Sequence, residues 1–390
     1  MYLSQTTGRY GPAYGVSEMA NNAVDTTGFA QTQKIEATGK KLRVAFIGTG
    51  GIAGAHIPAL MKCPDVEIVG LCDIIPERSR QYMEKAKCTK EQCFTDYTKM
   101  LQAVKPDAVS VCTPNGVHAP AAIAASRAGA HVIVEKPMAM NPKECQAMID
   151  AAKKAGKKLV IGFQYRYHPN TAFIKNAADK GVFGDIMFAR VQALRRRGIP
   201  NWGVFGQKKL QGGGPCIDIG VHVLEMTHYV MGSPKPVAAV GNTWTYLGNK
   251  PSKVKCTWPN WDHKTYTVED LAIGQIRFAN GALLHLEASF AAHIEKDVWN
   301  FEINGTKGGA KWDPPTLFRD DMDYMTNSTP SWVGNGDFGG LFDDKLRGFV
   351  DHALYNKPTI APGEAGMAVQ KMLDGIYRSA AAGGKEVKIV

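Results

Sequence analysis

The chain has 390 residues, more than one typical domain needs, and 44% of them are apolar, which suits a globular protein of two domains. No apolar run approaches the roughly 18 residues that cross a bilayer, so we expect no membrane association. The formal net charge is +10, but the basic residues are scattered and lack a nucleic-acid-binding motif, so we expect no nucleic-acid partner. The eight cysteines form no Cys-x-x-Cys pair, which favours reduced thiols and a cytoplasmic protein.

Residues 1–41 differ in composition from the rest of the chain. They are rich in Thr, Gly, Ala, Asn and Gln, and they have few large aliphatic residues. They also lack the basic start and the apolar core of a signal peptide. We interpret them as a polar N-terminal arm, which either extends as a tail or lies across a neighbouring subunit.

Residues 42–163 alternate between predicted strands and helices. The strands are apolar on both faces, which is typical of a parallel sheet covered by helices on both sides. Strands are expected at 42–47, 66–72, 94–95, 108–112, 131–134 and 158–162, and helices at 53–62, 76–86, 96–104, 118–128 and 142–155. This segment therefore predicts an α/β domain with a parallel sheet.

A glycine-rich turn, Gly48-Thr49-Gly50-Gly51-Ile52-Ala53, joins the first strand to the first helix. Such a turn presents free backbone N–H groups at a helix N-terminus, where a pyrophosphate binds. The next strand ends at Asp73, 25 residues after Gly48, close to the spacing expected of a carboxylate that holds an adenosine ribose. The two features predict a dinucleotide site; the alternative is an ordinary tight turn with a surface aspartate.

Further polar segments follow strands of this sheet, at the edge where ligands of such sheets collect. Glu135-Lys136-Pro137 places a lysine in the cofactor crevice, unless that lysine is simply solvated. The loop from Thr113 to His118 either borders the nicotinamide ribose or caps a helix through Asn115. Gln164 and Arg166 lie either within reach of nicotinamide and substrate or in a solvated linker.

Residues 164–390 have a different pattern, with alternating strands and few helices between them. Strands are expected at 186–194, 237–246, 272–278, 282–290 and 298–303, and helices at 169–180, 216–231, 342–355 and 364–381. Asn280-Gly281 and Asn304-Gly305 are hairpin signals. We expect a second, α+β domain with a large, mostly antiparallel sheet that is open on one face. An open face needs covering, so we expect a homo-oligomer, a dimer or a tetramer.

The second polar constellation follows three consecutive glycines and contains Asp218 and His222. Residues four apart share one face of a helix, so the carboxylate is expected beside the imidazole. There it would orient the ring and stabilise its protonated form. The alternatives are a satisfied core histidine and a zinc site. No nearby Cys or His pair completes a zinc site, so we expect no metal. Trp202 lies in an irregular segment, where its ring either stacks on a sugar or anchors the core.

These motifs resemble the Gfo/Idh/MocA oxidoreductase family over residues 42–390. The resemblance rests on the glycine turn, Asp73, Thr113-Pro114-Asn115-x-x-His118, Glu135-Lys136-Pro137, the Arg166 segment and Asp218-x-Gly220-x-His222. It implies an N-terminal Rossmann domain over 42–163, a substrate and oligomerisation domain over 164–390, and a catalytic group of Lys136, Asp218 and His222. The candidate cofactor residues are Gly48, Gly50, Gly51, Ile52, Asp73, Arg78, Thr113, Asn115, His118, Glu135 and Gln164, and the candidate substrate residues are Lys136, Arg166, Trp202, Asp218 and His222.

The resemblance implies NAD-dependent oxidation of a secondary hydroxyl on a sugar, polyol or glycoside. Asp73 favours NAD over NADP because its charge repels a 2′-phosphate, although Arg78 nearby leaves NADP open. The implied roles are His222 as general base, Asp218 as its orienting group and Lys136 as stabiliser of negative charge; Lys136 and His222 can exchange roles. The loop 195–202 and the insertion 247–266 resemble segments of relatives that act on larger glycosides, among them at the C3 hydroxyl of the sugar. An NAD-dependent glycosidase and a non-catalytic cofactor-sensing regulator are the alternatives, and the regulator would not need the three catalytic residues.

Overall fold

The computed structural model describes residue 39, residues 41–334 and residues 336–390. The predicted N-terminal arm therefore lies, apart from residues 39 and 41, outside the described residues. All eight cysteines lie inside them and are unpaired, as expected of reduced thiols. None of the helices in the described part of the chain has the length and hydropathy needed to cross a membrane.

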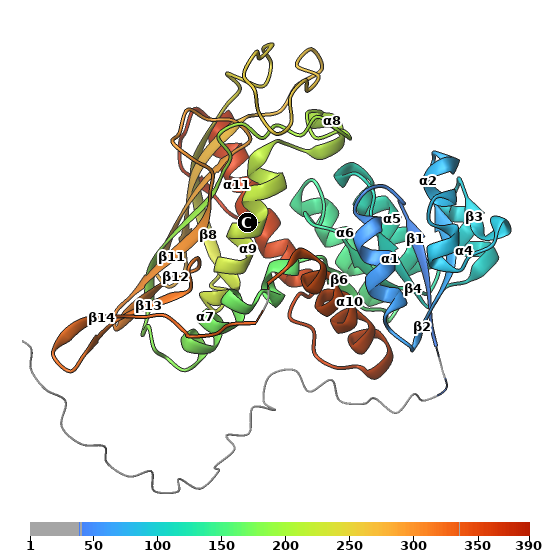
Figure 1. Ribbon diagram of the computed structural model, residues 1–390, viewed down its shortest axis with the longest axis horizontal. Helices are drawn as coiled ribbons and strands as arrows, with labels where there is room; N and C mark the ends of the chain where they lie inside the picture. Colours follow the sequence, from blue (N-terminus) through green and yellow to red (C-terminus); the bar gives the residue numbers. More distant parts are fainter. Residues whose placement is uncertain (1–38, 40, 335) are drawn as a thin grey trace, which may run out of the picture. The chain divides into compact units, whose positions relative to one another are not determined.

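The first sheet has six parallel strands in the order β3-β2-β1-β4-β5-β6 within the described residues (Figure 1). The strands are β1 (Leu42–Ile47), β2 (Val66–Cys72), β3 (Cys93–Phe94), β4 (Ala108–Val111), β5 (His131–Val134) and β6 (Leu159–Ile161). The chain leaves β1 in one direction and returns on its other side as β4, so the strand order reverses between these two strands. The crevice outside their carboxyl ends is where such sheets bind ligands. The prediction of a parallel, doubly covered sheet is confirmed.

The helices of this part are α1 (Ala53–Met61), α2 (Pro76–Arg80), α3 (Met83–Ala86), the short 3₁₀ helix η1 (Lys90–Gln92), α4 (Tyr97–Val104), α5 (Asn115–Arg127) and α6 (Pro142–Lys154). The helix expected at 76–86 is divided into α2 and α3. Helix α5 begins at Asn115, and its N-cap is Pro114 rather than Asn115. The Asn115 side chain instead donates to the carbonyl of Gln211 at 2.9 Å, so the capping interpretation is wrong.

The second sheet has nine strands in the order β14-β13-β12-β11-β7-β10-β9-β8-β15 among the described residues. They are β7 (Ile186–Leu194), β8 (Pro236–Trp244), β9 (Leu271–Phe278), β10 (Leu283–Ser289), β11 (Val298–Gly305), β12 (Gly308–Lys311), β13 (Thr316–Asp321), β14 (Tyr324–Ser328) and β15 (Val387–Lys388). All neighbours are antiparallel except β7 and β10. The sequence did not predict β12 to β15, because these strands are short, glycine-rich or polar and lack a period-two apolar pattern.

The remaining helices are η2 (Gln164–Tyr167), α7 (Pro169–Asp179), α8 (Lys208–Gln211), the π-helical segment η3 (Cys216–Gly220), α9 (Val221–Val230), α10 (Phe338–Tyr355) and α11 (Gly363–Ala381). Helices α9 and α11 lie on one face of the nine-stranded sheet (Figure 1). Helix α10 packs instead against α1, where the rings of Phe342 and His56 lie 5.5 Å apart. Helix α10 belongs to the predicted second domain but packs against the first, so the domain boundary at residues 163 and 164 stays a prediction.

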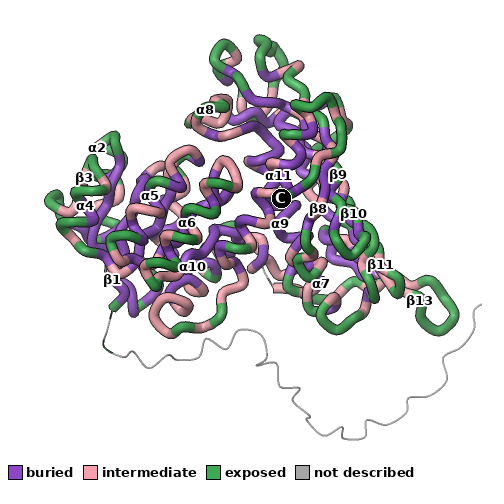
Figure 2. Tube along the Cα trace, turned by 180° about the vertical axis from the view of Figure 1, so that it is seen from behind, coloured by how far each residue is buried: buried purple, intermediate pink, exposed green. Residues whose placement is uncertain are grey.

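The other face of the nine-stranded sheet is open. In β7, Ala189, Val191 and Ala193 are buried toward the helices, whereas the residues between them are exposed or half-buried. Phe188 pairs with Leu283 on the open face, and both side chains are exposed. Figure 2 shows exposed residues along β10, β11 and β13. The prediction of a largely antiparallel sheet with one open face is confirmed.

Candidate active site

The glycine turn ends β1 at the carboxyl edge of the six-stranded sheet. Gly48 has a φ of +86°, and a Cβ on it would lie 2.7 Å from the carbonyl carbon of Cys112, so only glycine fits there. A Cβ on Gly50 or Gly51 would meet nothing within 4 Å. Open space therefore lies in front of these two residues, next to Ile52 at the N-cap of α1. A pyrophosphate fits this cradle because nothing in the described chain fills it and the helix N-terminus favours an anion.

Asp73 is buried at the end of β2 and lies beside the glycine turn. One carboxylate oxygen accepts from the backbone N–H of Thr49 at 2.9 Å, and the other accepts from that of Ile75 at 3.0 Å. Each oxygen keeps a second lone pair, which can accept from a ribose hydroxyl. The guanidinium of Arg78 is half-exposed and lies 3.9 Å from the carboxylate. The position of the Asp73 carboxylate suits a ribose. The positive charge of Arg78 could still bind the less favoured 2′-phosphate of NADP.

Two buried polar atoms at neighbouring strand ends have no hydrogen-bond partner among the described residues. They are Oγ1 of Thr113, after β4, and Oε1 of Gln164, after β6. A buried polar atom without a partner is costly, so native structures rarely leave one unsatisfied. Both atoms lie at the edge where the sequence predicts nicotinamide and its ribose, and these groups could supply the missing partners. The residues present therefore fit a dinucleotide.

Two predicted cofactor residues use their side chains inside the protein. The ring nitrogens of His118 lie 2.8 Å from the carbonyl oxygen of Pro137 and 2.9 Å from that of Thr113. The ring thereby ties the loop after β4 to the cis Lys136–Pro137 turn after β5. The carboxylate of Glu135 binds buried partners, His56 and Lys345, described below. The prediction that these side chains contact the cofactor is wrong, since burial requires internal partners for polar groups. Asn115 donates one amide N–H to the carbonyl of Gln211, and its contact with the cofactor stays a prediction.

Lys136 and Asp218 come together across the two halves of the chain. The ammonium group of Lys136 donates to the carboxylate of Asp218 at 3.0 Å and to its backbone carbonyl at 2.9 Å. Both side chains are largely buried. An ammonium group has three N–H donors, so one donor of Lys136 is left without a partner among the described residues. That donor is available to a substrate oxygen.

His222 lies one helical turn after Asp218, but the two side chains form no hydrogen bond among those found in the described residues. Asp218 lies in the π-helical segment η3, which is wound with i to i+5 hydrogen bonds and so shifts the angle between residues four apart. Its carboxylate binds Lys136 instead. The expectation that Asp218 orients His222 is therefore wrong. The His222 ring packs edge-on against Tyr165 at 5.1 Å and near Trp299 at 5.8 Å, and its Nδ1 atom is buried without a partner.

The electrostatic surroundings keep the His222 ring neutral. Burial lowers its pKa well below the ordinary value, and the positive charges of Lys136, Lys345 and Arg195 lower it further. The negative charge of Glu135 opposes this shift only in part. A neutral imidazole can accept a proton, so this ring is suited to act as a base near neutral pH.

Arg195 is a site residue that sequence reasoning missed. Its guanidinium lies over the ring of Trp258 at 4.9 Å, and its charge acts on both Asp218 and His222. From the sequence, Arg195 was considered only as the first residue of the loop 195–202. The period of β7 contained a better signal, because the half-buried Arg195, just after the strand, continues the alternation of Ala189, Val191 and Ala193.

Trp202 is half-exposed and packs edge-on against Trp258 at 4.7 Å, so it lies one ring beyond Arg195. Tyr165 and Trp299, which pack against His222, were also not selected from the sequence. Nothing in their local patterns separated them from core aromatic residues. A role for Trp202 in substrate binding stays a prediction.

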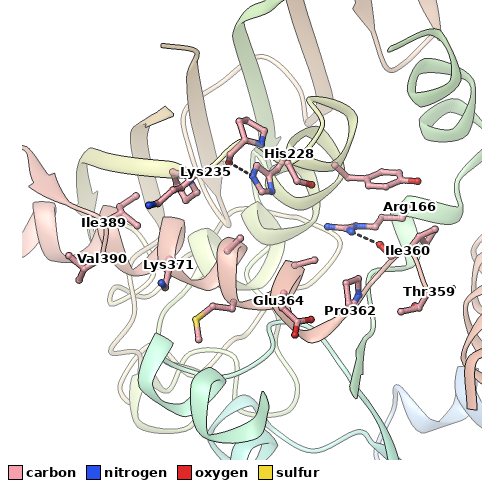
Figure 3. A pocket seen from close by; sticks show the side chains of 17 residues that line it. Arg166, His228, Lys235, Thr359, Ile360, Pro362, Glu364, Lys371, Ile389 and Val390 are labelled. Atoms are coloured by element: carbon pink, nitrogen blue, oxygen red, sulfur yellow. Dashed lines mark hydrogen bonds between the residues drawn. The ribbon is translucent and has the colours of Figure 1, made fainter. Parts of the chain in front are cut away.

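Arg166 does not belong to this group. It is 4% exposed, its Nε donates to Glu225 at 2.7 Å, and its Nη1 donates to the carbonyl of Ile360 at 2.5 Å. It lines a separate cavity of about 890 Å³ with His228 and Lys371, and none of the three catalytic candidates lines that cavity (Figure 3). The prediction that Arg166 contacts the substrate is therefore wrong, because its charge is held by a buried ion pair.

We expect Arg166→Met to lower the free energy of unfolding by about 3–5 kcal/mol, because it leaves the buried carboxylate of Glu225 without its counter-charge. The combined Arg166→Met and Glu225→Met variant should recover most of this loss. Denaturant unfolding measures both effects. A stable Arg166→Met variant with a strongly raised KM for substrate would restore Arg166 to the active site.

The fold and the site define a nicotinamide-dependent oxidoreductase. Residues 42–163 match the model of an oxidoreductase family with an NAD-binding Rossmann fold, and residues 175–389 match the C-terminal α/β domain of the same family. The chain belongs to the Gfo/Idh/MocA oxidoreductase family, and it is an NAD-dependent enzyme. The resemblance stated from the sequence motifs is confirmed.

Several characterised proteins are similar over most of the chain. D-glucoside 3-dehydrogenase of Escherichia coli is 36% identical over 352 residues, which cover 90% of this chain and 98% of that protein. Levoglucosan dehydrogenase of Pseudarthrobacter phenanthrenivorans is 31% identical over 285 residues, covering 69% of this chain and 73% of that protein. The solved structure of a levoglucosan dehydrogenase in complex with NADH has a TM-score of 0.77 and 26% identity, and it covers 90% of this chain and 100% of its own.

Proposed function

We propose that this enzyme oxidises a secondary hydroxyl of a sugar or glycoside, with the C3 hydroxyl of a glucoside as the favoured target. The observation that carries the proposal is the pairing of Lys136 with Asp218, which leaves one ammonium N–H free. The charge of Lys136 also helps to keep the buried His222 ring neutral. The similarity to a D-glucoside 3-dehydrogenase supports the substrate class. The aromatic rings of Trp202 and Trp258 next to Arg195 suit a sugar with a further group attached.

The proposed roles follow from the charges of the side chains. NAD, bound along the glycine turn, would supply the acceptor for the hydride that leaves the carbinol carbon. The ring of His222 accepts the hydroxyl proton, since burial keeps it neutral. The free N–H of Lys136 donates to the substrate oxygen and stabilises the negative charge that develops there. Asp218 holds the Lys136 ammonium through two hydrogen bonds, so it is a partner of Lys136 rather than of His222.

A panel of glucosides, free sugars and polyols, assayed by NADH absorbance, tests this proposal. We expect steady NADH formation with glucosides and accumulation of the keto sugar with its aglycone still attached. Released aglycone without net NADH would instead favour the NAD-dependent glycosidase. Saturable NAD binding without turnover of any member of the panel would favour the cofactor-sensing regulator.

Asp73→Asn is expected to lower the preference for NAD over NADP by about 10- to 100-fold, because the variant loses the charge that binds the ribose and repels a 2′-phosphate. The amide oxygen that remains can still accept from the N–H of Thr49, so the glycine turn should persist. The ratio of the two kcat/KM values measures the effect. An unchanged ratio in a folded variant would show that Asp73 serves only the turn.

We also propose that the enzyme is a cytoplasmic homo-oligomer, a dimer or a tetramer. The open face of the nine-stranded sheet supports this, because it exposes Phe188 beside Leu283 among polar residues. Exposed apolar groups that lie together on a soluble protein commonly mark an interface. Sedimentation equilibrium should give a mass of two or four times 42.3 kDa, and a mass of 42.3 kDa would contradict the proposal.

A further inference from the structure

A buried ionic cluster lies directly behind the turn that carries Lys136. It consists of His56 in α1, Glu135 after β5 and Lys345 in α10. The carboxylate of Glu135 lies 2.5 Å from the ammonium of Lys345 and 2.8 Å from Nε2 of His56. Lys345 is 1% exposed and also packs over the ring of Phe342 at 3.9 Å. Lysine is almost never this buried unless it is paired, so the pair with Glu135 explains its position.

The same carboxylate contacts the main chain of the catalytic lysine. The backbone N–H of Lys136 donates to the second oxygen of Glu135 at 3.3 Å. A Cβ on Gly162 would lie 2.6 Å from the first oxygen, so the carboxylate packs closely against the end of β6, where only glycine leaves space for it. The carbonyl of Pro137 is held from the other side by His118. The turn from Glu135 to Pro137 is therefore fixed at both ends by buried polar groups.

The three side chains of the cluster differ in their protonation states. Burial alone would raise the pKa of Glu135, but Lys345 and His56 hold it well below its ordinary value, so the carboxylate is ionised. Burial and the ammonium of Lys345 lower the pKa of His56 to about 4, so its ring is neutral. Burial also lowers the pKa of Lys345, and the negative charge of Glu135 opposes that shift. Lys345 therefore supplies the counter-charge that keeps Glu135 ionised.

We propose that Lys345 is a positioning residue for the reaction, which acts through Glu135 to hold the main chain of Lys136 in register with Asp218. The inference rests on the proposed function, in which Lys136 contacts the substrate oxygen. Lys345 comes from α10, 210 residues after Glu135, and it has no contact with Asp218 among the interactions of the described residues. Apart from its charge, which lowers the pKa of His222, Lys345 therefore acts on the reaction through the turn.

A double-mutant cycle on Lys345→Met and Glu135→Gln tests the proposal. Lys345→Met should lower kcat by about 100-fold while the KM for the sugar changes less than about threefold, because the turn moves but the binding surface stays. In the Glu135→Gln background, Lys345→Met should change kcat by less than about threefold, since the two residues act as a unit. If the single Lys345→Met protein does not fold, the kcat of Glu135→Gln is compared with that of the double variant, whose cluster holds no unpaired charge. Similar decreases in kcat in the single and double variants support the proposal. A decrease in the double variant that is larger by a further factor of about ten or more overturns it.

Lys62→Met is the matched control. Lys62 forms an exposed ion pair with Asp343 at 2.5 Å, so the variant weakens the same contact of α1 with α10 without touching Glu135. It should keep the kcat of the unmodified enzyme. A tenfold fall in its kcat would attribute the effect to helix packing and would contradict the proposal.

A second measurement separates this inference from the proposed function. The acetylation rate of Lys136, followed by mass spectrometry, needs no substrate. It should rise about tenfold in both Lys345→Met and Glu135→Gln, because a displaced turn frees the ammonium from Asp218. An unchanged rate in both variants would overturn the positioning role. Failure of the unmodified enzyme to oxidise any glucoside would reject the proposed function, and the acetylation rates would still decide the role of Lys345.

Discussion

Lys136→Met is expected to lower kcat/KM for the sugar by about 10²- to 10⁴-fold, because it removes the N–H donor that stabilises the developing oxyanion. The KM for NAD should change little, since the glycine turn and Asp73 are untouched. The methionine side chain also leaves the Asp218 carboxylate without its ammonium partner, so unfolding should be measured in parallel. Stopped-flow NADH absorbance at saturating NAD gives the rate.

The pH dependence of the residual activity gives an independent check on Lys136. The positive charge of Lys136 lowers the pKa of His222, so removing that charge raises the pKa. The base must be unprotonated to act, and the acidic limb of the kcat/KM profile should therefore move to higher pH in Lys136→Met. Lys143→Met, an exposed lysine at the start of α6, is the control and should keep the profile of the unmodified enzyme. A Lys136→Met protein with full activity would remove Lys136 from the mechanism.

His222→Ala is expected to cause a loss of about 10²- to 10⁴-fold in kcat/KM, because the hydroxyl proton then has no positioned acceptor. In the unmodified enzyme the pKa of His222 lies below 6.5, so activity should persist below pH 6.5 and fall only as the pH drops through the lowered value. The variant should lose this acidic limb. NADH absorbance measures both effects over a range of roughly pH 4.5 to 9, which extends on both sides of the ordinary histidine pKa of about 6.5.

His352→Ala is the control for the second variant, since that ring hydrogen-bonds the carbonyl of Lys357 at the end of α10. Its activity should match that of the unmodified enzyme. A His222→Ala protein that keeps the acidic limb would show that another group limits the rate at low pH. The proton would then have to pass to a different base.

The cofactor part of the site could be predicted from the sequence because its elements are close in the chain. β1, the glycine turn, α1 and β2 form one continuous unit, and the φ of Gly48 and the open space at Gly50 depend on the local backbone. The strand pattern after residue 164 also predicted the second sheet, since period-two burial is a local property. It did not predict β12 to β15, whose place depends on pairing with neighbours rather than on their own composition.

The partners of the polar residues could not be predicted in the same way. Position at a strand end indicated a ligand role for Glu135, His118 and Arg166 alike, yet each binds a buried group contributed by another part of the chain. Arg195 shows the opposite error, because a residue not selected from the loop 195–202 has a charge that acts on both Asp218 and His222. In each case burial decided the outcome.

By itself, the sequence determined the α/β alternation and the dinucleotide turn, because these depend on backbone preferences and on spacing within single elements. It also supplied the residues that we propose as the catalytic group, through the family motifs that contain them. Only the tertiary structure decided that Asp218 binds Lys136 and not His222, and that Lys345 neutralises Glu135. The physical reason is that a charge removed from water must find a counter-charge within a few ångströms. Which counter-charge that is depends on how the helices and sheets pack.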